Sequence, residues 1–179
     1  MVGVGGGYLL GPGGGVKEWV MGVRKARVGD VPAIHALVNF FARREKMLPL
    51  SLSDVYDRLR DFFVYEEDGE AVACCALHVV WEDLAEVRSL AVREDLSGRG
   101  IGRGLVAACV GEAPGLGVQR VFTLSFVPEF FEKLGMVRVE KETLPHKVWA
   151  DCVKCPHFPN CDEVALEAPV DDGGIVRQD

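Results

Sequence analysis

Several features that would assign a function at once are missing from this sequence of 179 residues. No Gly-Lys-Ser or Gly-Lys-Thr occurs, which excludes the P-loop of nucleoside triphosphatases. No apolar run approaches about 18 residues, so no helix is expected to cross a membrane. Acidic residues outnumber basic ones, 27 against 20, and the net charge of −7 disfavours a surface for nucleic acids. With an apolar content of 49%, the chain has the composition of an ordinary globular protein.

The sequence also lacks a disulfide framework and a secretory signal. Two of its six cysteines, Cys74 and Cys75, are adjacent in a strand pattern, and Cys109 lies in a helix pattern. Residues 1–21 are rich in glycine and carry neither a charged start nor a cleavage site. We therefore expect a cytoplasmic protein. We expect residues 1–21 to be a disordered tail, or the product of a misplaced start codon, without a function.

The most informative segment begins as a strand pattern at 86–92 and continues through a glycine-rich turn into an apolar helix pattern. Four alternating glycines allow backbone amides to approach a ligand without intervening side chains: Gly98, Gly100, Gly102 and Gly104. These amides then open a helix, whose free N–H groups and dipole favour a phosphate. Arg99 and Arg103 add positive charge for phosphate oxygens. The segment therefore predicts a binding site for a pyrophosphate.

Two known pyrophosphate motifs fit this segment to different degrees. The dinucleotide fingerprint has one formal match, at 102–107, but it begins about ten residues after the strand and no acidic residue follows about 20 residues on. The second motif, [QR]-x-x-G-x-[GA] after a strand that ends in an apolar triplet, belongs to the GNAT acetyltransferases, which this segment closely resembles. In the usual alignment it falls on 97–102, with Ser97 in place of Gln or Arg, and a second frame starts at Arg99. The resemblance implies that acetyl-CoA is bound, as co-substrate, by Leu90, Ala91, Val92, Gly98, Arg99, Gly100, Ile101, Gly102 and Arg103.

The order of the predicted elements is also that of the GNAT fold. We predict an α/β protein whose mixed, mostly antiparallel sheet is flanked by helices, in the order β-α-α-β-β-β-α-β-α-β. The acetyltransferase domain is expected to span residues 22–150, followed by a cysteine-containing segment and a frayed tail in 151–179. The predicted strands are 23–28, 63–65, 71–80, 86–92, 120–125 and 136–140. Helices are expected after the N-cap Asp30, after Ser51 or Ser53 as N-cap, after the glycine-rich turn and at 129–134.

Three segments, 75–92, 121–136 and 144–149, resemble the short, stand-alone bacterial N-acetylglutamate synthases. The resemblance implies transfer of the acetyl group of acetyl-CoA to the α-amine of L-glutamate, the first step of arginine biosynthesis. Longer forms of that enzyme carry an amino-acid-kinase domain that binds arginine, for which this chain has no room, so regulation through it is not expected. The alternatives are acetylation of another small amine or of a protein α-amine, and non-catalytic binding of acyl-CoA. The oligomeric state is left open, with a homodimer as one alternative.

Acetyl transfer to an amine requires a base that removes a proton and a donor that stabilises the oxyanion. Glu86 lies in the strand that lines the predicted site and matches a glutamate of the family, so it is the candidate general base, acting through a water. The alternative interpretation is a salt bridge with Arg88, because residues i and i+2 of a strand share a face. The fold implies that a backbone N–H near residues 90–92 meets the oxyanion.

Assignments for the general acid and for substrate binding are less direct. The tyrosine that usually protonates the departing thiolate in this family is replaced by Phe131, which leaves Ser125 as a weaker candidate donor. The two carboxylates of glutamate favour cationic partners. Four cations are available near the predicted site, with Arg88 ahead of Lys46, Arg43 and Lys147. We therefore assign substrate binding to Arg88, Ser125 and Lys46, and interpret His78 as a core or wall histidine rather than a base.

The C-terminal cysteines have the spacing C-x2-C-x5-C. Cys152, Cys155 and Cys161, with His157 between the last two, could complete a zinc site or hold an iron–sulfur cluster. Strong zinc patterns use two separated C-x-x-C pairs, whereas one pair and a single further cysteine are present here. We therefore predict no metal and interpret these residues as a packed terminal segment.

Overall fold

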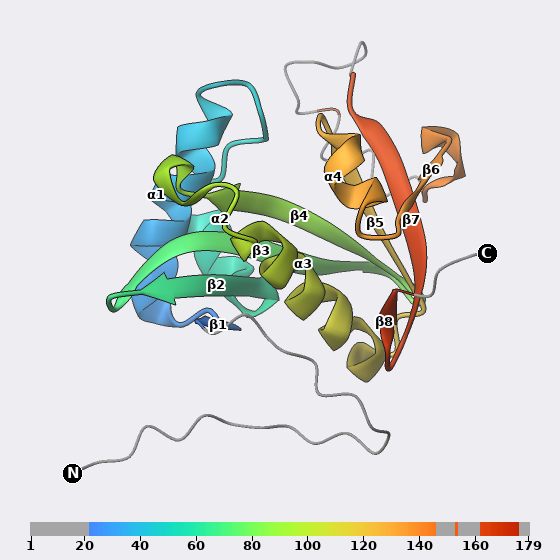
Figure 1. Cartoon of the computed structure of the whole chain (residues 1–179), viewed down its shortest axis with the longest axis horizontal. Helices are drawn as coiled ribbons and strands as arrows, with labels where there is room; N and C mark the ends of the chain where they lie inside the picture. The colour runs from blue at the N-terminus through green and yellow to red at the C-terminus, as the bar shows by residue number, and fades with distance from the viewer. Residues whose placement is uncertain (1–21, 146–152, 154–161, 176–179) are drawn as a thin grey trace.

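The computed structural model describes residues 22–145, 153 and 162–175, and these form one mixed sheet with helices on both faces (Figure 1). The strands follow the order β1-β2-β3-β4-β5-β7-β6, and β8 pairs with β7. Helices α1 and α2 pack on one face, whereas α3 and α4 pack on the other. The predicted α/β fold is therefore confirmed.

The element bounds are as follows. The strands are β1 (Val23–Lys25), β2 (Phe62–Glu67), β3 (Glu70–Trp81), β4 (Leu84–Val92), β5 (Arg120–Ser125), β6 (Val137–Val139), β7 (Val164–Asp171) and β8 (Gly174–Ile175). The α-helices are α1 (Val31–Ala42), α2 (Leu52–Asp57), α3 (Ile101–Glu112) and α4 (Pro128–Glu132). Short 3-10 turns are η1 (Val28–Asp30), η2 (Leu59–Asp61), η3 (Glu94–Leu96), η4 (Ala113–Leu116) and η5 (Lys141–Thr143).

Strands β4 and β5 form the parallel pair in the middle of the sheet, and they stay together over a short stretch. Leu84, Ala85 and Glu86 face residues 120–122 of β5, and beyond Glu86 the two strands are no longer paired. Figure 1 shows the two strands running apart, with α3 packed against β4 and α4 against β7 and β6. The divergence therefore opens the sheet at the carboxyl ends of two parallel strands, the end at which ligands commonly bind in open sheets.

A β-bulge in β4 changes which side chains face each side of the sheet. Ala76 pairs with Arg88 and Cys74 pairs with Ala91, so two residues of β4 lie opposite Cys75. Ser89, one of the two, has a φ of 54°, in the left-handed region. Because of the extra residue, Leu90 packs with the core under α3 and Ala91 with the core under α1.

The C-terminal part of the chain belongs to the sheet, which corrects the sequence analysis. β7 lies between β5 and β6, so the expectation that the domain ends at residue 150, with only a terminal segment and a frayed tail in 151–179, is wrong. The alternation of β7 buries Leu166, Ala168 and Val170 among other residues, but it is short and interrupted by Pro169. That proline lies between the residues of β7 that pair with β6 and those that pair with β8.

The predicted N-terminal tail, residues 1–21, lies outside the part of the chain that the structure describes.

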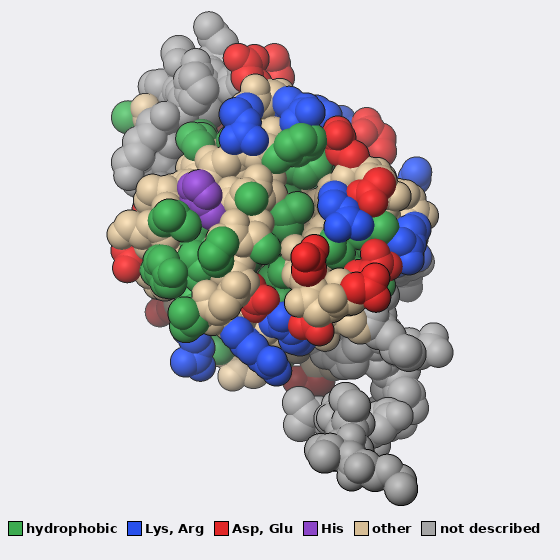
Figure 2. All heavy atoms as spheres, turned by 90° about the vertical axis from the view of Figure 1, so that its left-hand side faces the viewer, with side chains coloured by type: hydrophobic (Ala, Val, Ile, Leu, Met, Phe, Trp, Pro, Cys, Tyr) green, Lys and Arg blue, Asp and Glu red, His purple; other side chains and the backbone are tan. Residues whose placement is uncertain are grey.

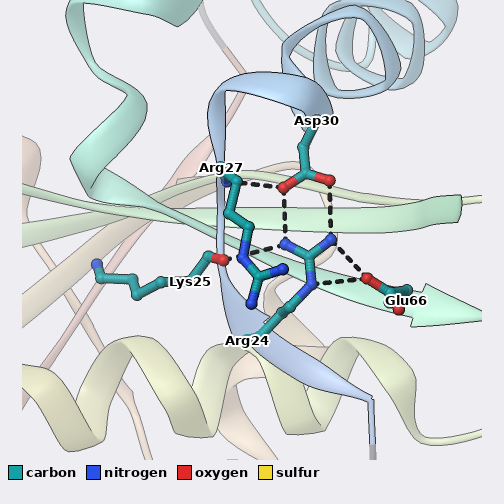
Figure 3. A network of polar contacts seen from close by, with 5 residues as sticks. All are labelled: Arg24, Lys25, Arg27, Asp30 and Glu66. Carbon is teal, nitrogen blue, oxygen red and sulfur yellow. Dashed lines mark hydrogen bonds and ion pairs between the residues drawn. The ribbon is translucent and has the colours of Figure 1, made fainter. Parts of the chain in front are cut away.

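An ion-pair network ties β1 to the start of α1 (Figure 3). The guanidinium of Arg24 donates to both carboxylate oxygens of Asp30 at 2.7 and 2.9 Å, and to Glu66 Oε2 at 2.8 Å. The backbone N–H of Arg27 donates to the same Asp30 carboxylate at 2.7 Å. Asp30 thus occupies the predicted N-cap position of α1, but its side chain binds Arg24 and Arg27 instead of capping the helix. Arg24 holds the pKa of the Asp30 carboxyl below its usual value.

We expect Asp30→Asn to lower the free energy of unfolding at pH 7 by about 1–3 kcal/mol, because it leaves buried donors of Arg24 poorly satisfied. The lowered pKa makes this contribution complete above the unfolded-state pKa of about 4, and it is lost as the pH falls through the folded-state pKa. Urea unfolding of both proteins between pH 3 and pH 7 measures the difference. A difference that stays constant over that range would contradict the assignment, and Asp95→Asn, in an exposed pair with Arg93, is the matched control that should change little.

Candidate active site

Glu86 and Arg88 lie side by side on the face of β4 that is covered by α1 and α2. Arg88 Nη1 and Glu86 Oε2 are 3.2 Å apart, and the two side chains are only 13% and 15% exposed. The salt bridge considered as the alternative role of Glu86 therefore forms. The contact places a carboxylate and a guanidinium together on this face of the sheet.

Glu86 stands where the sheet opens. It is the last residue of β4 in register with β5, opposite Phe122, and on its other side it is in register with His78 of β3. Phe122 is fully buried, whereas Glu86 and His78 are half-buried. The carboxylate therefore lies at the vertex between the diverging strands, with an apolar neighbour on one side and an imidazole on the other.

The glycine-rich turn joins the end of β4 to α3. Gly98 and Gly100 have φ values of 80° and 81°, which L-residues with a side chain rarely adopt. Gly100 is the N-cap of α3 and supplies no side-chain cap, so it leaves the N–H groups of the first turn uncapped. Ile101 is buried in the core and can offer a ligand only its backbone. The turn thus has the features of an anion site at a helix N-terminus.

The two arginines of the turn are arranged differently. Arg99 Nη2 lies 3.0 Å from Glu67 Oε1 at the end of β2, so its charge is already paired at the surface. Arg103 is exposed and forms no ion pair with any residue that the structure describes. Arg103 is therefore the better placed of the two to meet a phosphate.

Gly102 faces α4 across the opening. A Cβ atom at this position would lie 3.5 Å from the ring of Phe130 and 3.8 Å from a methyl group of Val92. Leu90, Val92 and Phe130 all pack partly buried against the same core. The first turn of α3, the end of β4 and the start of α4 therefore converge at Gly102, where any side chain would occupy the space between them.

Ser125 and Phe131 lie on the opposite side of the opening. Ser125 ends β5, is 8% exposed, and its Oγ accepts a hydrogen bond from Val127 N–H at 3.0 Å. The hydroxyl proton remains free to be donated elsewhere. Phe131 is 4% exposed and packs edge-on against Phe130 in the core. No hydroxyl replaces the tyrosine of the family at this position.

The other predicted substrate ligands lie outside β4 and β5. Lys46 and Arg43 are exposed in the region that follows α1. Lys147 lies outside the described residues, as do the four predicted metal-ligand candidates at 152, 155, 157 and 161. Within the described ranges no group of His, Cys, Asp or Glu side chains could hold a metal ion. No helix in the same ranges is long and apolar enough to span a membrane.

One polar contact of this face was missed in the sequence. His78 Nδ1 lies 2.7 Å from Asp61 Oδ2, which is held by η2 just before β2. The pairing of His78 with Glu86 follows from the position of the hairpin turn at Glu82 and Asp83, so it could have been predicted from the sequence. The position of Asp61 could not have been predicted in this way, because it depends on how η2 packs against β3.

A groove of about 570 Å³ lies on another part of the molecule, between α1, the start of β3 and η3. Figure 2 views the side of the protein that carries α1, where hydrophobic side chains gather between charged ones. The groove is lined by neither Glu86 nor Arg88, nor by any glycine of the turn. It is therefore separate from the candidate active site.

Comparisons with known proteins give the same family from sequence and from structure. Residues 32–136 match the model of the acetyltransferase (GNAT) family. An uncharacterized N-acetyltransferase of Chlorobaculum tepidum is 40% identical over 144 residues, which cover 80% of this chain and 93% of that protein. An amino-acid acetyltransferase of Mycobacterium tuberculosis is 41% identical over 121 residues, which cover 66% of this chain and 69% of that protein.

Two solved structures resemble this one closely. A Mycobacterium tuberculosis protein in complex with CoA and NLQ has a TM-score of 0.73 and 32% identity, over 83% of this chain and 99% of that one. The N-acetylglutamate synthase of Neisseria gonorrhoeae, complexed with coenzyme A and N-acetyl-glutamate, has a TM-score of 0.76 and 26% identity. The match covers 83% of this chain but only 35% of the synthase. The family model that matches this chain, together with the relatives and the fold, shows that the chain belongs to the GNAT family of N-acetyltransferases.

Proposed function

We propose that this protein is an N-acetylglutamate synthase, which transfers the acetyl group of acetyl-CoA to the α-amine of L-glutamate as the first step of arginine biosynthesis. The observation that carries the proposal is the Glu86–Arg88 pair at the vertex of the diverging strands, on the strand that leads into the glycine-rich turn. A carboxylate can accept the proton of an amine, and a neighbouring guanidinium can hold a substrate carboxylate. The names of the relatives from Mycobacterium tuberculosis and Neisseria support the same substrate class.

Acetyl-CoA is the co-substrate of this family, and the chain offers it a site between β4 and α4. The pyrophosphate lies against the first turn of α3, where Gly98 and Gly100 shape the loop and Arg103 adds charge. The thioester extends toward β4, where a backbone N–H among residues 90–92 stabilises the oxyanion.

The chemical steps are assigned to three side chains. Glu86 removes a proton from the substrate ammonium through a water, and the free amine attacks the thioester carbon. Arg88 binds a carboxylate of glutamate through its guanidinium. The C–S bond then breaks, and Ser125, whose hydroxyl proton is free, donates that proton to the departing thiolate and regains one from the nitrogen that becomes the amide. Lys46 is the weakest of the proposed ligands, because it is exposed in the region after α1.

The proposal is tested by measuring CoA release from acetyl-CoA in the presence of glutamate, glutamine, other amino acids and peptides. We expect saturable turnover with glutamate and little with peptides. Turnover on a different amine would replace glutamate as the substrate. Binding of acetyl-CoA with no turnover on any amine would instead favour an acyl-CoA-binding module, which the buried Phe131 would permit.

A further inference from the structure

Asp61 and His78 form a carboxylate–imidazole pair on the same face as Glu86. Asp61 Oδ2 and His78 Nδ1 are 2.7 Å apart, and the side chains are 26% and 31% exposed. Among the residues that the structure describes, Asp61 is the only hydrogen-bond partner of the imidazole. A carboxylate at this distance selects the tautomer in which Nδ1–H donates, which leaves Nε2 with a free lone pair.

His78 and Glu86 face each other across the β3–β4 hairpin. They are directly in register, which places such pairs on one face of the sheet with Cβ atoms about 4.5–5.5 Å apart. Side chains of this length reach each other directly or through one water at that separation. His78 is also twice as exposed as Glu86, whose side chain is 15% accessible to solvent. Of the two in-register side chains, the imidazole is therefore the one with more access to solvent.

The chemistry of the proposed reaction creates a proton that must leave the site. An ammonium and acetyl-CoA give an amide, a CoA thiol and one proton. The nitrogen loses two protons in all; one ends on the thiolate when the C–S bond breaks, and the other reaches the solvent. A base as shielded as Glu86 must release this proton before the next turnover, so it needs an exit route.

We propose that His78 is the residue through which this proton leaves, and that Asp61 positions it. Nε2 accepts the proton that Glu86 has taken, so the O–H bond at the Glu86 carboxyl breaks and an N–H bond forms at the imidazole. The imidazolium is held between the carboxylates of Asp61 and Glu86 until it releases the proton to solvent. No electrons are transferred, and Glu86 returns to its ionised form. The inference rests on the proposed acetyl transfer and adds a proton route to it.

The proton route is tested by measuring kcat and KM for variants of the full-length protein. We expect His78→Gln to lower kcat by about 10–100-fold, less than the loss of the base itself, with both KM values within about twofold. Asp61→Asn should lower kcat less, because the ring is retained but its tautomer is no longer fixed. Imidazole added to the medium should restore turnover to His78→Ala, since the site is accessible. His35→Gln, a partly buried histidine of α1, is the matched control and should leave kcat unchanged.

A second measurement does not depend on the substrate. Nitrogen NMR of labelled protein should show that the neutral imidazole of His78 carries its proton at Nδ1 rather than at Nε2, and Asp61→Asn should change this tautomer ratio. If the wild-type protein acetylates a different amine, glutamate is not its substrate, and the variants are then compared with that amine instead. The route is overturned if His78→Gln keeps the wild-type kcat, if imidazole restores nothing, or if the wild-type ring carries its proton at Nε2.

Discussion

Replacement of Glu86 by glutamine is expected to lower kcat for acetyl transfer by about 10²–10⁴-fold, the usual contribution of a general base. Glutamine has nearly the same shape and can still accept a hydrogen bond from Arg88, so the 3.2 Å contact can persist. It cannot take a proton from an ammonium. We therefore expect binding of acetyl-CoA and the thermal midpoint to stay close to those of the wild type.

The pH dependence separates this role from a purely structural one. The loss of kcat should shrink at high pH, because more of the substrate amine is then already deprotonated and needs no base. A Glu86 that only pairs with Arg88 would give a modest loss of stability and an unchanged pH–rate profile. Glu82→Gln, in the exposed turn between β3 and β4, is the matched control. If Glu86→Gln keeps the wild-type rate at neutral pH, the substrate amine loses its proton to bulk water, and Glu86 is not the general base.

Introduction of valine at Gly102 is expected to weaken acetyl-CoA binding by at least about tenfold, which corresponds to ~1.4 kcal/mol. The Cβ atom itself would fit at 3.5 Å from Phe130 and 3.8 Å from Val92. The additional methyl groups of valine would extend into the space where α3, β4 and α4 converge. Alanine at the same position should give an intermediate loss, which calorimetric titration with acetyl-CoA measures.

Two controls keep this prediction specific. Gly115→Ala, in a turn where a Cβ atom meets nothing within 4 Å, should leave the affinity for acetyl-CoA unchanged. A circular dichroism spectrum shows whether Gly102→Val is folded. A folded Gly102→Val protein with the wild-type dissociation constant would remove the glycine-rich turn from the coenzyme site.

Local patterns predicted most of the fold. Ser51 caps α2 through a 3.1 Å bond from Asp54 N–H, as its position before an apolar pattern indicated. The β2–β3 turn at Asp68 and Gly69 and the bounds of β5 also follow from short-range signals. These elements were predictable because each is specified by residues that are close in sequence.

Contacts between distant segments were not predictable in the same way. β7 pairs with β5 and β6, whose residues precede it by dozens of positions, and its own alternation is weak. The bond between Arg24 and Glu66 joins residues 42 positions apart, so no local pattern indicated it. Arg24 and Asp30 are only six positions apart, and there the local pattern gave Asp30 as the N-cap of α1 without the ion pair. For the site, the sequence indicated Glu86 and the glycine turn, but not the position of Asp61 next to His78.

The central claim, acetyl transfer to L-glutamate, is tested most directly by the ratio of kcat/KM for glutamate to that for glutamine with the purified wild-type protein. The two substrates differ by one side-chain carboxylate, so the ratio reports whether the site provides a cationic partner for it. We expect glutamate to be preferred by about tenfold or more, with N-acetylglutamate identified as the product by mass spectrometry. A ratio below one, or acetylation of neither amino acid, would contradict the assignment.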